Sequence, residues 1–193
     1  MEFNIEKSID KERVVDENTG YWFIRTCIVA TYTDFIKHNY VSIGFNNVLQ
    51  KDIGINDSDI KNFREHNDSK DFCRDLAASK WINQLIDFQH AIKVGDVVVI
   101  HDSNLDQFTI GVVESDAYLV EDNRAFLYNK NDEPYPEKRR KIKWDRNIIG
   151  SNISELKDLI NIPQAISRAD NYADIIEGFV SSVIFDKIRC LWF

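Results

Sequence analysis

The sequence predicts an α+β domain, a small curved or barrel-like β-sheet with inserted and C-terminal helices. Three observations favour this fold class. Short segments rich in β-branched and aromatic residues recur along the chain, and turn signals separate most of them. Apolar residues at three- and four-residue spacing occur in one inserted stretch and near the C-terminus. Strands and helices do not alternate strictly, which favours a curled sheet over a doubly wound one.

The composition fits one globular domain with a substantial core, because 44% of the 193 residues are hydrophobic and 12% are aromatic. With 24 Lys and Arg against 32 Asp and Glu, the formal net charge is −8. This charge argues against indiscriminate binding to nucleic acid but leaves room for one local basic patch. Cys27, Cys73 and Cys190 lie far apart and indicate reduced thiols. With no signal peptide and no long apolar segment, we expect a cytoplasmic protein that does not enter a membrane.

The elements are expected in the following order. Strands are expected at 21–30, 40–45, 97–100, 108–114, 118–120 and 138–144. Helices are expected as one turn from Thr33, within 52–89, at 153–160 and at 164–192, with Pro163 beginning the last one; a turn is expected at 93–96 and a polar loop at 101–104. The chain then divides into an acidic arm over 1–20, a sheet domain over 21–150 and a C-terminal helical extension over 151–193. We expect the extension to pack on the domain, although its apolar faces also suit a partner or a second copy.

No catalytic residue can be nominated from these residues. The chain lacks the GxSxG elbow of serine hydrolases and the glycine-rich motifs that cradle phosphates. The four histidines fall in separate segments without metal-ligand spacing, and the paired carboxylates lie where helices are expected to start. We therefore expect a protein that is not an enzyme and that has neither a metal nor a cofactor.

A basic run at 138–146 is the sharpest feature of the sequence, with six positive charges and one negative charge. On a strand, Arg139, Lys141 and Lys143 share one face, while Arg140, Ile142 and Trp144 share the other. Three cations on one face can contact the phosphates of a nucleic acid in a salt-sensitive manner. The alternative is a solvated edge strand whose charges prevent aggregation. The spacing leaves both open.

Aromatic residues form a second group, of which most members must lie in the core of a domain this size. The alternation along the first strand places Tyr21 and Phe23 on one face and Trp22 and Ile24 on the other. A few rings could still line a pocket for a flat ligand such as a nucleobase. Arg25 is unusual in an apolar strand, and it needs a carboxylate, carbonyl or phosphate partner.

Five segments in order resemble the EVE-like branch of the PUA superfamily, which is related to YTH domains. They are 21–26 (YWFIRT), 41–45 (VSIGF), 93–99 (KVGDVVV), 110–113 (IGVV) and 138–144 (KRRKIKW). The resemblance covers about residues 20–146 and is strongest to the N-terminal sensor modules of Mrr- and McrB-like restriction and other prokaryotic defence proteins. Such modules are curved β-barrels with flanking helices that bind a nucleobase, often a modified one flipped out of DNA.

The resemblance implies a set of site residues. Those of the base pocket are Trp22 and Arg25, then Ile43, Gly44 and Phe45, and then His101, Asp102 and Ser103, while those approaching phosphates are Arg139, Lys141 and Lys143. Phe45 stands where many relatives have Trp, and relatives usually carry a nuclease or ATPase domain after the sensor. The acidic net charge is also unusual for a DNA reader.

The function expected from the resemblance is a non-enzymatic sensor of a modified base in a prokaryotic restriction or antiviral defence system. Its partners would be nucleic acid, with DNA favoured over RNA, a separate effector protein, and a second copy through the C-terminal helix. Two alternatives keep the same fold, namely a protein-interaction or oligomerisation module and a binder of a free nucleotide. Hydrolysis of a modified nucleoside, as in ASCH-type relatives, ranks last because no general base can be assembled.

Overall fold

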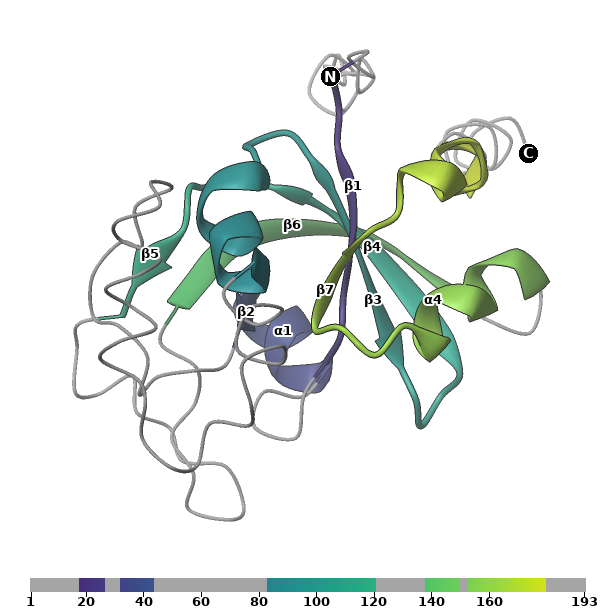
Figure 1. Cartoon of the computed structure of the whole chain (residues 1–193). Helices are drawn as coiled ribbons and strands as arrows, with labels where there is room; N and C mark the ends of the chain where they lie inside the picture. The colour runs from purple at the N-terminus through teal and green to yellow at the C-terminus, as the bar shows by residue number, and fades with distance from the viewer. Residues whose placement is uncertain (1–17, 27–31, 44–82, 121–137, 150–152, 180–193) are drawn as a thin grey trace, which may run out of the picture.

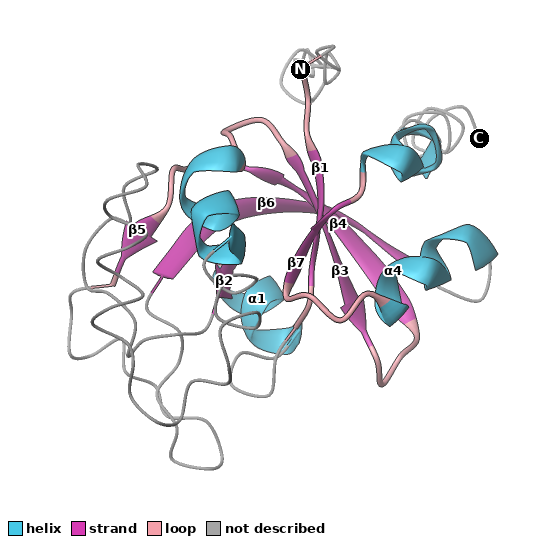
Figure 2. Cartoon of the chain, viewed as in Figure 1, coloured by secondary structure: helices cyan, strands magenta, loops and turns pink. Residues whose placement is uncertain are grey.

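The computed structural model describes residues 18–26, 32–43, 83–120, 138–149 and 153–179. Seven strands form one mixed sheet that curls into a half-barrel, with short helices on both sides of it (Figures 1 and 2). The strands are β1 (Tyr21–Ile24), β2 (Tyr40–Ile43), β3 (Val97–Asp102), β4 (Gln107–Val113), β5 (Tyr118–Leu119), β6 (Lys138–Ile149) and β7 (Ile166–Arg168). The named helical segments are α1 (Tyr32–His38), η2 (Asp87–Ala91), η5 (Ser154–Leu156), α4 (Lys157–Asn161) and η6 (Asp170–Tyr172). Helical residues 83–86 precede η2, and a helix over 173–179 follows η6.

The strand order is β2-β6-β4-β3-β1-β7, with β5 pairing to β6. Only β1 and β3 run parallel among the described strand pairs, and the others are antiparallel. The expected α+β class with a curled sheet is therefore confirmed.

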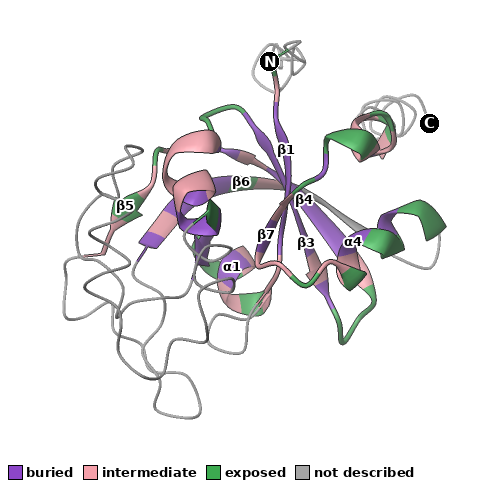
Figure 3. Cartoon of the chain, in the orientation of Figure 1, coloured by how far each residue is buried: buried purple, intermediate pink, exposed green. Residues whose placement is uncertain are grey.

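Two hydrophobic cores lie on the two faces of this sheet. Trp22 and Ile24 point into the inner core, where they meet α1, η2 and the inner side of β6, whereas Tyr21 and Phe23 point into an outer core beneath α4 and the C-terminal helix. The alternation predicted for the first strand is thus confirmed. Because β1 and β3 are covered on both faces, every residue of β1 is buried (Figure 3), as expected for such apolar runs.

The β3–β4 hairpin is longer than predicted. His101 and Asp102 were expected in a loop, but they belong to β3 and pair with Phe108 and Gln107. The turn occupies 103–106 instead, where Asp106 has a φ of 47°. His101 and Asp102 are polar, which favours a loop, but their pairing with β4 keeps them in the strand.

The prediction of continuous helix from Gln164 is wrong for the first part of that segment. Ile166–Arg168 form strand β7, which pairs antiparallel with β1, and helix resumes only at η6. The Gln84 side-chain oxygen holds the start of this strand, accepting the backbone N–H groups of Ala165 (2.6 Å) and Ile166 (3.2 Å). In a helix the backbone N–H and C=O groups of this segment would bond to each other. Here they bond to β1 and to the Gln84 side chain instead.

Several expectations lie outside the described residues. These are most of the acidic arm, the strand ends at 27–30 and at Gly44 and Phe45, the helices expected within 52–82, and the chain beyond 179. Within the described ranges, no helix is both long and apolar enough to cross a membrane.

A glycine is required where β4 bends against β6. The register between these strands shifts between Ile110 and Gly111, and a Cβ at Gly111 would lie 2.5 Å from Ile142 Cγ2 and 2.6 Å from Trp144 Cε3. We expect Gly111→Ala to destabilise the domain by about 1–3 kcal/mol, measured by urea unfolding. The matched control is Gly178→Ala, where a Cβ meets nothing within 4 Å. Equal stabilities of the two variants would contradict this reading.

Candidate functional site

The outer face of β6 carries the basic residues that the sequence singled out. Lys141 and Lys143 are exposed and Arg139 is partly exposed, whereas Arg140 and Ile142 between them are buried. Among the residues that the structure describes, neither Lys141 nor Lys143 forms an ion pair. The predicted separation of the run into a basic face and an inner face is therefore present, and we call Arg139, Lys141 and Lys143 the basic face.

Two tyrosines lie beside the basic face. The Arg139 guanidinium carbon lies 4.3 Å from the centroid of the Tyr40 ring, a distance typical of a cation–π contact. Tyr118 pairs with Arg139 in the β5–β6 ladder and is 37% exposed. Burial raises the pKa of the Tyr118 hydroxyl, and the Arg139 charge opposes the rise. The basic face thus lies beside one partly exposed ring, that of Tyr118, while Tyr40 is buried in the inner core.

Not every cation of the basic run is available to a ligand. Arg140 is 1% exposed, and its guanidinium donates to the carbonyl oxygens of Phe88 (2.7 Å), Gln89 (3.0 Å) and Ser115 (2.9 Å). Burial lowers the pKa of Arg140, an effect that the carboxylates Asp116 and Asp96 oppose. Lys138 is also buried. Arg140 therefore fixes helix η2 and the segment after β4 to the sheet.

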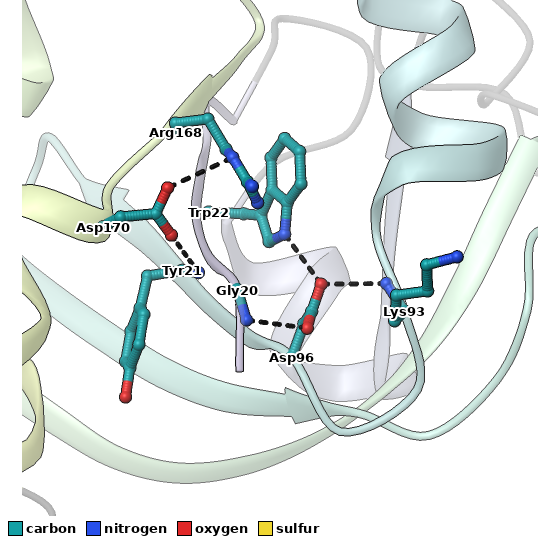
Figure 4. Close-up of polar contacts among 7 residues, drawn as sticks. All are labelled: Gly20, Tyr21, Trp22, Lys93, Asp96, Arg168 and Asp170. Atoms are coloured by element: carbon teal, nitrogen blue, oxygen red, sulfur yellow. Dashed lines mark hydrogen bonds and ion pairs between the residues drawn. The ribbon is translucent and has the colours of Figure 1, made fainter. Parts of the chain in front are cut away.

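A second polar constellation surrounds the start of β1 (Figure 4). The Asp96 carboxylate accepts three N–H groups at 2.9 Å, from the Gly20 and Lys93 backbones and from Trp22 Nε1. Asp96 ends the predicted turn over 93–96, in which Gly95 has a φ of 95°. The KxGD pattern thus serves to place one carboxylate beneath the tryptophan.

Arg168 of β7 lies over the ring of Trp22, whose indole nitrogen contacts Asp96. Its guanidinium carbon lies 4.3 Å from the Trp22 ring centroid, and its Nε donates to Asp170 at 3.1 Å (Figure 4). Asp170 also accepts the Tyr21 backbone N–H at 3.0 Å, and the Tyr21 hydroxyl donates to Glu177 at 2.7 Å. These contacts tie β7 and the C-terminal helix to β1.

A cleft of about 620 Å³ opens among these groups. Its polar lining combines two cations, Lys93 and Arg168, with four carboxylates, and the full lining is Asn18, Thr19, Gly20, Tyr21, Ala91, Lys93, Asp96, Arg168, Asp170, Ala173, Asp174 and Glu177. Nearby, burial raises the pKa of the Asp87 carboxyl and the Arg168 charge opposes the rise. We call this hollow the β1 cleft.

Trp22 and Arg25 do not line one pocket together. Trp22 is 2% exposed and belongs to the inner core. Arg25 instead donates through Nη2 to the carbonyl oxygens of Ile160 (2.5 Å) and Ile162, which end helix α4. Of the partners expected for Arg25, the carbonyl is the one observed. Trp22 in this place has no open ring face on which a base could stack.

The remaining residues implied by the resemblance are spread over the sheet. Ile43 is buried in the inner core at the end of β2. His101 lies 3.2 Å from the Asp106 carboxylate, Asp102 accepts the Asn104 backbone N–H at 2.9 Å, and Ser103 is exposed in the turn. Gly44 and Phe45 lie outside the described residues.

No pattern in the sequence predicted three residues of the β1 cleft, Arg168, Asp170 and Glu177. All three come from the C-terminal segment, whose contacts with β1 link residues about 150 positions apart, as in the 149-residue separation of Tyr21 and Asp170. No local pattern signals such contacts. Among the described residues, no three His, Cys, Asp or Glu side chains are grouped so that they could hold a metal ion.

The curled mixed sheet and its short helices define a barrel-like α+β domain, with a basic strand face and a charged cleft. The chain belongs to a family described as a domain of unknown function, DUF8426, whose model matches residues 27–165. The match covers β2 to β6, while β1 and β7 lie just outside it. A search of curated proteins finds no match.

Proposed function

We propose that the chain is a nucleic-acid-binding sensor that contacts phosphates through the basic face of β6. The observation that carries the proposal is the exposure of Lys141 and Lys143 on one face of a strand, in a chain whose net charge is −8. Within the described part of the chain Lys141 and Lys143 form no ion pair, and phosphates are the natural counter-charge for such exposed cations in an acidic protein. Tyr118, which pairs with Arg139 and is partly exposed, adds a ring on which a base can stack.

The finer proposal is a domain of EVE or PUA type that recognises a base, modified and flipped out of DNA, for a separate effector in prokaryotic defence. The resemblance of five ordered segments supports it, as does the curled sheet. Recognition without catalysis fits a chain in which no nucleophile and base can be paired from the sequence. Because Trp22 is buried, the stacking groups of this proposal must come from elsewhere.

Charge reversal on the basic face is the direct test. We expect Lys141→Glu combined with Lys143→Glu to weaken binding to short DNA duplexes by roughly tenfold or more and to lower the slope of log K against log salt by about two. Fluorescence anisotropy with duplexes that are unmodified or carry methylated adenine, methylated cytosine or hydroxymethylcytosine, at several salt concentrations, measures both. Unchanged binding would remove the basic face from the proposal.

Single variants supply a charge-matched control. Lys143→Glu and Lys157→Glu change the net charge equally, but Lys157 lies on α4 and not on β6. We expect only the first to alter the salt slope. Equal losses in both would indicate a general effect of net charge. Absence of binding to every duplex would favour the protein-interaction alternative.

A further inference from the structure

The Tyr21 side of the β1 cleft, which includes Glu177, lies on the same face of the sheet as the basic face. Arg168 pairs with Trp22 and projects to the other face, so the cleft opens around the start of β1. Directly paired residues project to the same side, and the register connects Tyr21 to Val97, Val97 to Val112 and Val112 to Lys143. Tyr21 and Val97 are accordingly in the outer core, and Lys143 is exposed on the same side. Three strand spacings of about 4.8 Å separate the ends of this row by about 14 Å, a distance that a few linked nucleotides can span.

The cleft contains a flat, fixed cation. The Arg168 guanidinium rests on Trp22 and is held through Nε by Asp170. Its side chain is 58% exposed and lines the cleft. A guanidinium held on one side in this way offers its other face to a planar ring, and nucleobases stack on arginine planes in this manner. The buried Trp22 thus supports a stacking surface instead of providing one.

The wall of the β1 cleft next to Arg168 consists of carboxylates, which favour a ligand with hydrogen-bond donors. Asp170, Asp174 and Glu177 line it. The contacts of Asp170 and Glu177 with Tyr21 orient their carboxylates, and a carboxylate oxygen can accept more than one donor. Carboxylates accept the exocyclic amino groups of bases such as cytosine, whereas the carbonyl at the same position of uracil offers no proton. The volume of about 620 Å³ lies within the range of small-molecule sites.

We propose that the β1 cleft binds a nucleobase with an exocyclic amino group, in a single-stranded segment whose phosphates lie over Lys143 and Lys141. This inference rests on the proposed function and adds to it the base and the place where it is bound. The base stacks on Arg168, and its amino group donates to the carboxylates of the C-terminal helix. A base that lacks the amino group still stacks on Arg168 but cannot donate to the carboxylates.

Oligo-dC and oligo-dU of equal length test the proposal, because cytosine and uracil differ at C4 in the group that the wall would read. We expect the protein to bind oligo-dC roughly tenfold more tightly than oligo-dU, measured by fluorescence anisotropy. Asp174→Asn combined with Glu177→Gln should remove this preference while leaving the salt slope unchanged. The matched control is Glu155→Gln combined with Asp158→Asn, which neutralises two exposed carboxylates on η5 and α4 and should preserve the preference.

The outcomes separate the two proposals. If oligo-dC and oligo-dU bind equally and Lys141→Glu combined with Lys143→Glu still lowers the salt slope, the cleft assignment fails and the basic face stands. Loss of the preference in the control variant would also overturn the assignment. If neither oligonucleotide nor any duplex binds, the proposed function itself fails.

Discussion

Trp22→Ala is expected to lower the free energy of unfolding by about 3–5 kcal/mol, the range for removing a buried aromatic side chain. Trp22 is 2% exposed and packs in the inner core. Its loss also removes one of the three N–H groups that Asp96 accepts and the surface beneath Arg168. Urea unfolding, followed by far-UV circular dichroism, measures the change.

Trp22→Phe separates packing from the hydrogen bond. Phenylalanine retains most of the ring area but cannot donate to Asp96, so we expect a loss of about 1.5–3 kcal/mol, the range for a hydrogen bond to a charged group. A Trp22→Ala protein that unfolds at the wild-type urea concentration but no longer binds oligonucleotide would contradict this assignment. That result would restore Trp22 to the lining of a pocket.

Arg140→Met is expected to lower the free energy of unfolding by about 3–5 kcal/mol, because the buried carbonyl oxygens that Arg140 contacts lose their charged donor. The three carbonyls belong to Phe88 and Gln89 of η2 and to Ser115. Methionine can fill much of the volume but donates no hydrogen bond. Equilibrium urea unfolding measures this loss.

Lys141→Met is the matched control for Arg140→Met. It makes the same kind of change one position along β6, on the exposed side, and exposed substitutions of this kind usually alter stability by no more than about 0.5 kcal/mol. In oligonucleotide binding we expect the order to reverse, with the Lys141 variant losing affinity. Similar stabilities of both variants would show that Arg140 does not anchor η2.

The features that the sequence predicted well are those that depend on neighbouring residues. Alternation along β6 separated Lys141 and Lys143 from Arg140, because side chains on a strand point to opposite faces in turn. A turn was predicted over 93–96, and within it Gly95 has the positive φ that glycine tolerates. Charge counting could not, however, distinguish the buried Arg140 from its exposed neighbours.

The features that the sequence could not supply depend on residues far apart in the chain. Strand β7 has three residues, too few for a periodic signal, and its formation depends on β1 and on Gln84. The role of Asp96 as acceptor for Trp22 and the cover of Trp22 by Arg168 were hidden for the same reason. Family resemblance placed Trp22 and Arg25 in one pocket, whereas their positions in the sheet separate them.

The position of β1 between β3 and β7 has a consequence for the order of folding. During synthesis β1 emerges before β3 and β7, but Trp22 forms a hydrogen bond with a residue 74 positions later and Tyr21 with one 149 positions later. Long-range pairing of this kind slows folding and leaves unpaired strand edges exposed in the meantime. Among the strands that the structure describes, β1 is therefore the earliest in the chain and one of the last to be completed, because its contacts wait until residue 170 has been added.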